Sequence, residues 1–166
     1  MRVPNGEERW SMYSSRLIEF DGVPASLSVT VDVTQLKVAE AQVRQSEARF
    51  AALFQLAPVP MSFTHERGQF SHTHWNDAWY RAFGFLPEQA EGRGGDALGI
   101  WIDPDQRRQL IEGAANKGGL HDFEVVLRRR NGALRQHLLF ADMVDTADGK
   151  AMIVAYVDVT DSRKAE

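Results

Sequence analysis

Three features of this sequence have residue types and spacings that could bind a metal or a small ligand or couple a strand to a helix. They are a pair of histidines, a set of four aromatic residues and a repeated Asp-x-Thr motif. His72 and His74 are separated by one residue, so a strand would place both imidazoles on one face, where they could hold a metal ion. No third ligand is visible near them in the sequence. We therefore interpret the pair as solvated side chains on a strand and predict no metal site.

A set of aromatic residues forms the candidate pocket for a small ligand. Its members are Trp79, Tyr80, Phe83 and Trp101. Such rings can line a site for a planar molecule, and they also build ordinary hydrophobic cores, so both interpretations stay open. The chain of 166 residues contains no cysteine, which excludes disulfides, thiolate metal sites, a catalytic cysteine and a cysteinyl photoadduct.

No catalytic motif is visible in the sequence. Residues 94–96 read Gly-Gly-Asp, as in the Gly-Gly-Asp-Glu-Phe signature of diguanylate cyclases, but the Glu and the Phe of that signature are missing. The sequence also lacks a Walker loop for phosphate and a Gly-x-Ser-x-Gly motif. We therefore predict that this chain is not an enzyme.

Charge and hydrophobicity bear on partners and location. The formal net charge of -4 argues against nucleic acid as a partner. The run of arginines at residues 128–130 is either a patch for phosphate or an acidic partner, or the solvated tip of a hairpin. The longest apolar run, residues 151–157, is far below the ~20 residues of a membrane helix, and the first residues lack a signal core. We expect a cytoplasmic location and leave open the tethering of a longer parent protein to a membrane.

An internal repeat organises the chain. Residues 5–40 and 131–166 align without a gap; both begin with Asn-Gly, and both contain Val-Asp-Val-Thr near their end. Ten of the 36 aligned pairs are identical, including Arg9 with Arg135. The separation between the two copies is as long as a whole domain. We therefore predict that residues 1–34 are the C-terminal fragment of a preceding module, 35–56 a linker helix, 57–161 one complete domain and 162–166 the start of an outgoing linker.

Hydrophobic patterns and turn signals predict an α+β domain. Strands at residues 61–65 and 70–75 precede several short helices, the longest of which begins at Asp103, and three strands follow. Asn131-Gly132 predicts a type I′ turn between the first two of these three strands. The last two strands have apolar residues at both odd and even positions, so both of their faces are apolar. We expect one face to contact the core and the other to contact a helix or a partner chain. Residues 35–56 carry a short heptad pattern, which fits either a helix on the sheet or a parallel coiled coil.

The order and spacing of these motifs resemble the PAS domain family, in particular the tandem PAS modules of bacterial sensor proteins. The residues that carry the resemblance are Ser46–Phe50, Trp75-Asn76, Phe83–Phe85, Asp103, Arg107-Arg108, Phe123–Val125, Arg128–Gly132, Asp148-Gly149 and Val157–Thr160. The resemblance covers residues 46–166 as a full domain and 5–40 as a truncated one. It implies a five-stranded antiparallel sheet with short helices on one face, preceded by a linker helix.

The resemblance also implies a function. A PAS module of this kind is a sensory or regulatory domain that binds a small ligand in the cup of its sheet. It relays the signal through the helices after the Asp-x-Thr motif to an output domain, such as a histidine kinase or a diguanylate cyclase. The signal-coupling residues of this sequence are Asp32, Thr34, Asp158 and Thr160, and we expect each Thr to cap its helix. The alternative is a protein-interaction and dimerisation module with no ligand.

Expectations about cofactors and partners follow from the same resemblance. We predict no cofactor, although a non-covalent flavin or another small ligand stays open. Haem is not expected, because the helix that begins at Asp103 contains no histidine. The expected partners are neighbouring PAS and output domains of the same chain and a second copy in a homodimer.

Overall fold

The chain forms two compact units in a computed structural model that describes residues 6–67 and 70–165. The first unit comprises residues 1–51 and the second comprises residues 52–166. Most of the described helices and strands belong to the second unit.

The first unit contains a β-hairpin and most of a long helix. Strand β1 (Ser11–Phe20) pairs with β2 (Val23–Asp32) in antiparallel fashion. The turn residues Asp21 and Gly22 have positive φ angles of 49° and 75°, as a two-residue turn requires when it matches the twist of its strands. Helix α1 (Thr34–Leu56) begins one residue after β2.

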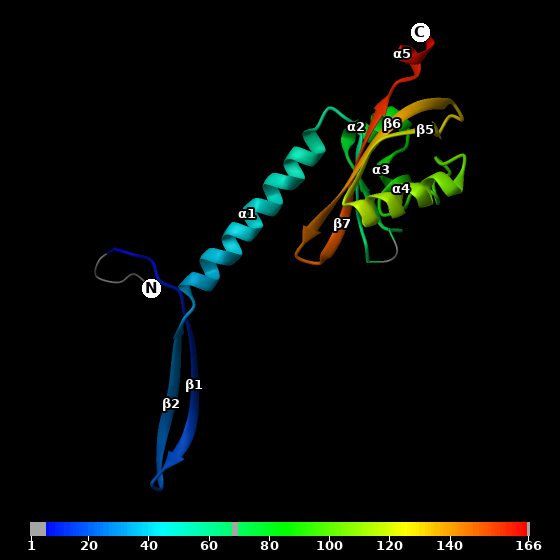
Figure 1. The fold of residues 1–166 in the computed structure, drawn as a ribbon. Coiled ribbons are helices and arrows are strands. Elements are labelled where there is room, and N and C mark those ends of the chain that lie inside the picture. The colour runs from blue at the N-terminus through cyan, green and yellow to red at the C-terminus, as the bar shows by residue number, and fades with distance from the viewer. Residues whose placement is uncertain (1–5, 68–69, 166) are drawn as a thin grey trace. The chain divides into compact units, whose positions relative to one another are not determined.

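The second unit is built on a five-stranded antiparallel sheet (Figure 1). Its strands are β3 (Met61–His65), β4 (Thr73–Trp75), β5 (Gly119–Arg128), β6 (Leu134–Thr146) and β7 (Gly149–Asp158). They lie in the order β4-β3-β7-β6-β5. The last strand in the chain is therefore the central one, and it contacts both halves of the sheet.

Short helices accompany this sheet. They are α2 (Asp77–Phe83), α3 (Pro87–Ala90), α4 (Pro104–Lys117) and α5 (Thr160–Lys164). Asn76 and Asp103 accept backbone N–H groups at the starts of α2 and α4, and Gly84 ends α2 with a φ of 80°. In the part of the chain that the structure describes, no helix combines the length and the apolar character needed to cross a membrane.

One face of the sheet carries the hydrophobic core. The buried core residues are Phe70, Trp75, Trp79, Phe83, Ala90, Ile100, Leu110, Ala114, Val125, Leu127, Leu139, Ala141, Met152, Val154 and Tyr156. Helices α2, α3 and α4 all contribute to this cluster, together with one face of β4, β5, β6 and β7. The structure thus confirms the predicted α+β class, with a five-stranded antiparallel sheet and short helices on one face.

The opposite face of the sheet is apolar and half-buried. Leu138 and Phe140 on β6 alternate with core residues, as do Ile153 and Ala155 on β7, and all four are partly exposed. Val157 is 39% exposed. Both faces of these strands are therefore apolar, as the sequence pattern predicts. That a helix or a partner chain covers the outer face remains a prediction.

Two local predictions are wrong. Strand β4 begins at Thr73 rather than at residue 70, because Phe70 has a left-handed backbone (φ 59°) that interrupts the extended conformation. The turn between β5 and β6 is not of type I′, because Gly132 has a positive φ of 86° and Asn131 does not. Instead, the Asn131 side-chain oxygen accepts the N–H of Ala133 at 2.9 Å, which stabilises a wider loop.

Candidate functional site

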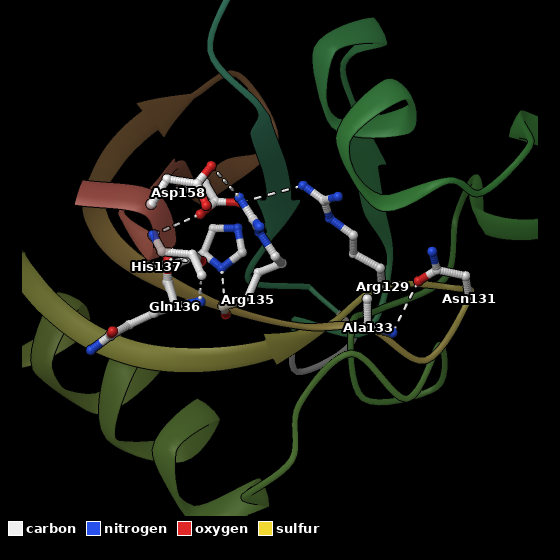
Figure 2. Close-up of polar contacts among 9 residues, drawn as sticks. Arg129, Asn131, Ala133, Arg135, Gln136, His137 and Asp158 are labelled. Atoms are coloured by element: carbon white, nitrogen blue, oxygen red, sulfur yellow. Dashed lines mark hydrogen bonds and ion pairs between the residues drawn. The ribbon is translucent and has the colours of Figure 1, made fainter. Parts of the chain in front are cut away.

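The end of the central strand β7 is held by a compact set of polar contacts. We name it the C-terminal clamp and define it as Arg135, Gln136, Asp158 and Thr160. The Nε of Arg135 donates to one carboxylate oxygen of Asp158 at 2.8 Å, and the backbone N–H of Thr160 donates to the other at 2.9 Å. The N–H of Gln136 donates to the Thr160 hydroxyl at 2.8 Å. Figure 2 shows the side chains of Arg135 and Arg129 pointing toward Asp158.

The clamp joins three elements of the second unit. Arg135 and Gln136 belong to β6, Asp158 is the last residue of β7, and Thr160 is the first residue of α5. The register pairs His137 with Asp158, so the residues just before His137 lie beside the chain as it leaves β7. The clamp therefore ties the end of β7 to the start of α5 and to β6.

The prediction that each Thr caps its helix is wrong. Helix α5 begins at Thr160 itself, and its hydroxyl contacts β6 through the N–H and the carbonyl of Gln136. The capping contact comes from Asp158, whose carboxylate accepts the N–H of Thr160. The physical reason is that an anion suits the positive end of a helix, whereas a hydroxyl can both donate and accept and so can bind a neighbouring strand.

The contacts of the clamp keep Asp158 ionised. Burial acts to raise the pKa of Asp158, but the hydrogen bonds from Arg135 and Thr160 outweigh burial and lower the pKa to about 2. The bonds to Asp158 and Asp161 raise the pKa of the Arg135 guanidinium. Arg129 adds a longer ion pair to Asp158 at 3.3 Å. The Arg135–Asp158 pair of the clamp is therefore charged at neutral pH.

A buried histidine connects the clamp to the core. His137 is 2% exposed, and its ring stacks on Phe83 of α2 with ring centroids 5.4 Å apart. Its Nδ1 lies 3.0 Å from the backbone carbonyl oxygen of Arg135, where a neutral ring donates (Figure 2). Burial lowers the pKa of His137, so the ring is uncharged at neutral pH.

The first unit contains the same arrangement, which we name the N-terminal clamp: Arg9, Trp10, Asp32 and Thr34. The guanidinium of Arg9 donates to Asp32 at 2.9 Å, as does the backbone N–H of Thr34. The N–H of Trp10 donates to the Thr34 hydroxyl at 2.9 Å. The bonds from the hydroxyl and the N–H of Thr34, followed by that from Arg9, lower the pKa of Asp32 to about 2.

The two clamps correspond through the internal repeat. The first hairpin pairs Ser11 with Asp32, and the second pairs His137 with Asp158, and the later pairs follow in the same register. Each hairpin therefore presents its Arg, its Asp and its Thr in the same relative positions. The residues beside the two clamps differ: Ser11 stands beside the N-terminal clamp where the core-linked His137 stands beside the C-terminal one.

Sequence reasoning finds the Asp and Thr residues of the clamps but not the arginines. Arg9 and Arg135 are an identical pair in the repeat, so a signal for them is present. Each arginine is 23 residues from its Asp, however, and the contact depends on the register of the hairpin between them. Trp10 and Gln136 contribute their backbone N–H groups, so their side-chain types give no sign of these contacts.

A small cavity of about 30 Å³ lies in the cup of the second unit. Its lining comes from the inner face of the sheet, from α4 and from the segments that connect them, and it consists of Ser62, Thr64, Phe70, Thr73, Trp75, Gly95, Trp101, Arg107, Leu110, Ile111, Met152, Val154 and Tyr156. The Ser62 and Tyr156 hydroxyls are 3.0 Å apart, and the Thr64 hydroxyl donates to that of Thr73 at 3.1 Å. Burial raises the pKa of Tyr156 to about 12, which keeps this phenol protonated.

The four predicted pocket residues lie in different surroundings. Trp101 lines the cavity. Trp79 and Phe83 are fully buried in the core, with their rings stacked 4.8 Å apart. The Tyr80 hydroxyl donates to Glu91 at 2.7 Å on the rim of the core. The structure therefore does not gather the four rings around one cavity, and their role in ligand binding remains a prediction.

The volume of the cavity bears on the cofactor. About 30 Å³ holds one or two water molecules, whereas sites for drug-sized ligands measure about 300–1,000 Å³. A flavin or a haem would thus have to displace core side chains, so the residues in place do not fit either group.

The histidines of the edge strand lie close together. The ring centroids of His72 and His74 are 5.2 Å apart, and those of His65 and His74 are 6.3 Å apart. Nδ1 of His74 is 2.5 Å from a carboxylate oxygen of Glu91. Over residues 6–67 and 70–165, no group of three histidine or acidic side chains is placed to hold a metal ion.

Comparisons with known proteins concern the fold. No protein-family model matches the chain, and no curated protein matches it. Solved structures do match. One is the d2 variant of RsLOV, which is 18% identical with a TM-score of 0.62, over 74% of this chain and 71% of that chain.

Two PAS domains match in the same way. The PAS domain of an HTR-like protein from Haloarcula marismortui is 16% identical with a TM-score of 0.56, over 74% of this chain and 98% of that chain. A PAS domain from a two-component sensor histidine kinase is 18% identical with a TM-score of 0.55, over 69% of this chain and 98% of that chain. The sheet order, the helices on one face and these matches together show that this chain has the PAS fold.

Proposed function

We propose that the chain is a non-catalytic sensory module in which a displacement of the PAS sheet is passed to the helix that leaves it. The duplicated clamp carries this proposal: the same Arg, Asp and Thr contacts bind β2 to the start of α1 and β7 to the start of α5. A simple helix cap needs one side chain. The clamps bring the neighbouring strand into the contact as well, which is what a strand-to-helix coupling requires.

The input end of the proposed relay is the cavity in the cup. Tyr156 lies on the same face of β7 as Asp158, two residues earlier, and its hydroxyl contacts Ser62 of β3 inside the cavity. A small polar ligand that replaces this hydroxyl pair would move Tyr156 and with it the end of β7. Because the cavity has room for only one or two waters, such a ligand either has only a few heavy atoms or opens the cup on binding.

The N-terminal hairpin supports a tandem arrangement. Its register, its clamp and its outgoing helix repeat those of β6, β7 and α5. We propose that residues 1–34 are the last two strands of a preceding PAS module and that α1 is the linker between the modules. The two clamps would then act in series along one chain.

The relay is tested by perturbing the cavity and observing the helix. Tyr156→Phe removes the hydroxyl pair with Ser62, and we expect it to shift the amide NMR resonances of residues 158–163 as well as those around the cavity. In an Asp158→Asn background the same change should leave residues 160–163 unaffected. Val126→Thr is the control, because it changes an exposed side chain of β5 that does not line the cavity and should leave residues 158–163 unaffected. Shifts confined to the cavity in both backgrounds would rule out the relay.

A second candidate function, a dimerisation module without a ligand, is favoured by the exposed apolar residues of α1. Leu36 and Val43 are 56% and 54% exposed and lie seven residues apart, on one side of the helix. A second copy could cover them. Sedimentation of the purified chain with and without Val43→Glu distinguishes a dimer held by this helix from a monomer.

A further inference from the structure

A groove outside the cup offers a second binding site. It has a volume of about 490 Å³ and lies between the end of α2 and the loop that joins β5 to β6. Its lining residues are Arg81, Ala82, Phe83, Gly84, Arg129, Arg130 and Asn131. We propose that this groove, named here the arginine groove, binds a small molecule that carries two or more oxyanion groups, and that the bound anion competes with Asp158 for Arg129.

The charge of the groove selects an anion. Three of its lining residues are arginines and none is acidic, in a chain whose formal net charge is -4. Arg81 and Arg130 are exposed and form no ion pair with any residue that the structure describes. Since guanidinium groups hold phosphates and carboxylates through paired N–H donors, two such groups on one groove favour a ligand with several oxyanions.

The walls of the groove are held in place by the backbone. The N–H of Arg130 donates to the carbonyl of Phe83 at 2.9 Å, which ties the β5–β6 loop to the end of α2. Gly84 ends α2 in a left-handed conformation with a φ of 80°, which fixes the backbone on this side of the groove. The Asn131 side-chain oxygen is occupied by the N–H of Ala133, so its amide N–H groups are left as donors. A site whose walls are held in place loses little entropy on binding.

Arg129 links the groove to the C-terminal clamp. It lines the groove and also donates to Asp158 at 3.3 Å, whereas Arg135 holds the same carboxylate oxygen at 2.8 Å (Figure 2). Arg129 is thus the weaker partner, and a bound anion can draw it away while Arg135 keeps its contact. The effect on the clamp rests on the proposed relay, but the binding of the anion does not.

The binding site is tested by NMR titration at constant ionic strength, with inorganic pyrophosphate and citrate as separate probes. We expect saturable shifts at the amides of Gly84, Arg130 and Asn131, and a loss of affinity of about tenfold or more in the Arg81→Gln/Arg130→Gln double variant. The matched control is Arg44→Gln/Arg108→Gln, which removes the same charge from exposed positions elsewhere on the chain. Tighter binding of pyrophosphate assigns a phosphate ligand, and tighter binding of citrate assigns a carboxylate ligand.

Shifts that do not saturate, or an equal loss of affinity in the control double variant, would overturn the site. Unchanged spectra elsewhere in each variant show that the fold is intact, and the single variants Arg81→Gln and Arg130→Gln separate the two contributions. The competition step has its own test. Asp158→Asn frees Arg129 and should raise the affinity for the tighter probe by about threefold or more, and an unchanged affinity would reject the competition.

Discussion

Asp158 is placed so that its two carboxylate oxygens bind different elements. One accepts from Arg135 of β6 and the other from the first N–H of α5. An amide at this position would keep one acceptor oxygen and present an N–H₂ group to the arginine, so the contact with β6 would be lost. The charge of the residue therefore matters as much as its shape.

The pH dependence of stability provides a test at the scale of the residue. Because the pKa of Asp158 is lowered from 3.8 to about 2, its contribution is complete above pH 3.8 and is lost as the pH falls toward 2. Asp158→Asn should lower the free energy of unfolding at pH 7 by about 1 kcal/mol after solvent screening. It should also flatten the decline of that free energy between pH 5 and pH 2. Denaturant titrations followed by tryptophan fluorescence measure both effects.

Asp161→Asn is the control for this experiment, since Asp161 is 82% exposed and binds the same Arg135 at 3.3 Å. It should change the free energy of unfolding by less than about 0.5 kcal/mol. An Asp158→Asn protein with the same pH profile as the wild type would mean that the clamp contributes nothing to folding.

The hydroxyl of Thr160 has a separate role, in binding β6. Thr160→Val removes the acceptor of the Gln136 N–H and should destabilise the second unit by about 1 kcal/mol. Thr160→Ser keeps the hydroxyl and should recover most of this loss. If the Ser and Val variants are equally unstable in denaturant titrations, the methyl group rather than the hydroxyl is the important part of the side chain.

At the scale of the element, the two hairpins share a register but differ in their support. Strands β6 and β7 lie inside a five-stranded sheet, with Leu139 and Val154 fully buried. Strands β1 and β2 form a two-stranded sheet that leaves Met12, Leu17 and Val29 more than half exposed. Isolated two-stranded hairpins are marginally stable in water.

Hydrogen exchange should therefore differ between the hairpins. In the monomeric chain we expect the central amides of β1 and β2 to exchange about a hundredfold or more faster than those of β6 and β7. The comparison is internal, because the two hairpins have the same register. Equal protection would show that the first hairpin is covered by another surface, and would contradict its description as two strands of an incomplete sheet.

The repeat predicts both hairpins because identical residues cluster at their ends, and a glycine with positive φ, Gly22 in the first and Gly149 in the second, lies at each turn. It also predicts the clamp residues Asp32 and Asp158. The Arg–Asp contacts are not predictable in this way, because they depend on which residues face each other across two strands. The cavity is still less predictable from the sequence. Its volume of about 30 Å³ is the space that remains unfilled after side chains from β3, β7 and α4 have packed together.

At the scale of the whole molecule, exposed apolar residues on α1 favour self-association. If a dimer forms through this helix, Val43→Glu should weaken it by about tenfold or more, because a charge would be buried in the interface. Arg44→Glu changes the charge at the adjacent position and should have little effect. Sedimentation equilibrium over a range of concentrations gives the dissociation constants, and a dimer insensitive to Val43→Glu would place the interface elsewhere.

A clamp that couples a strand to the following helix should make the two move as one body, and the N-terminal clamp allows the most direct measurement of this coupling. The chain has no cysteine, so Ser14→Cys on β1 and Arg44→Cys on α1 can carry two spin labels without background labelling. Pulsed electron–electron resonance should give one narrow distance distribution with Asp32 in place and a broad one after Asp32→Asn, with Glu47→Gln as the control. Equally narrow distributions in all three proteins would contradict the coupling of strand and helix by the clamp.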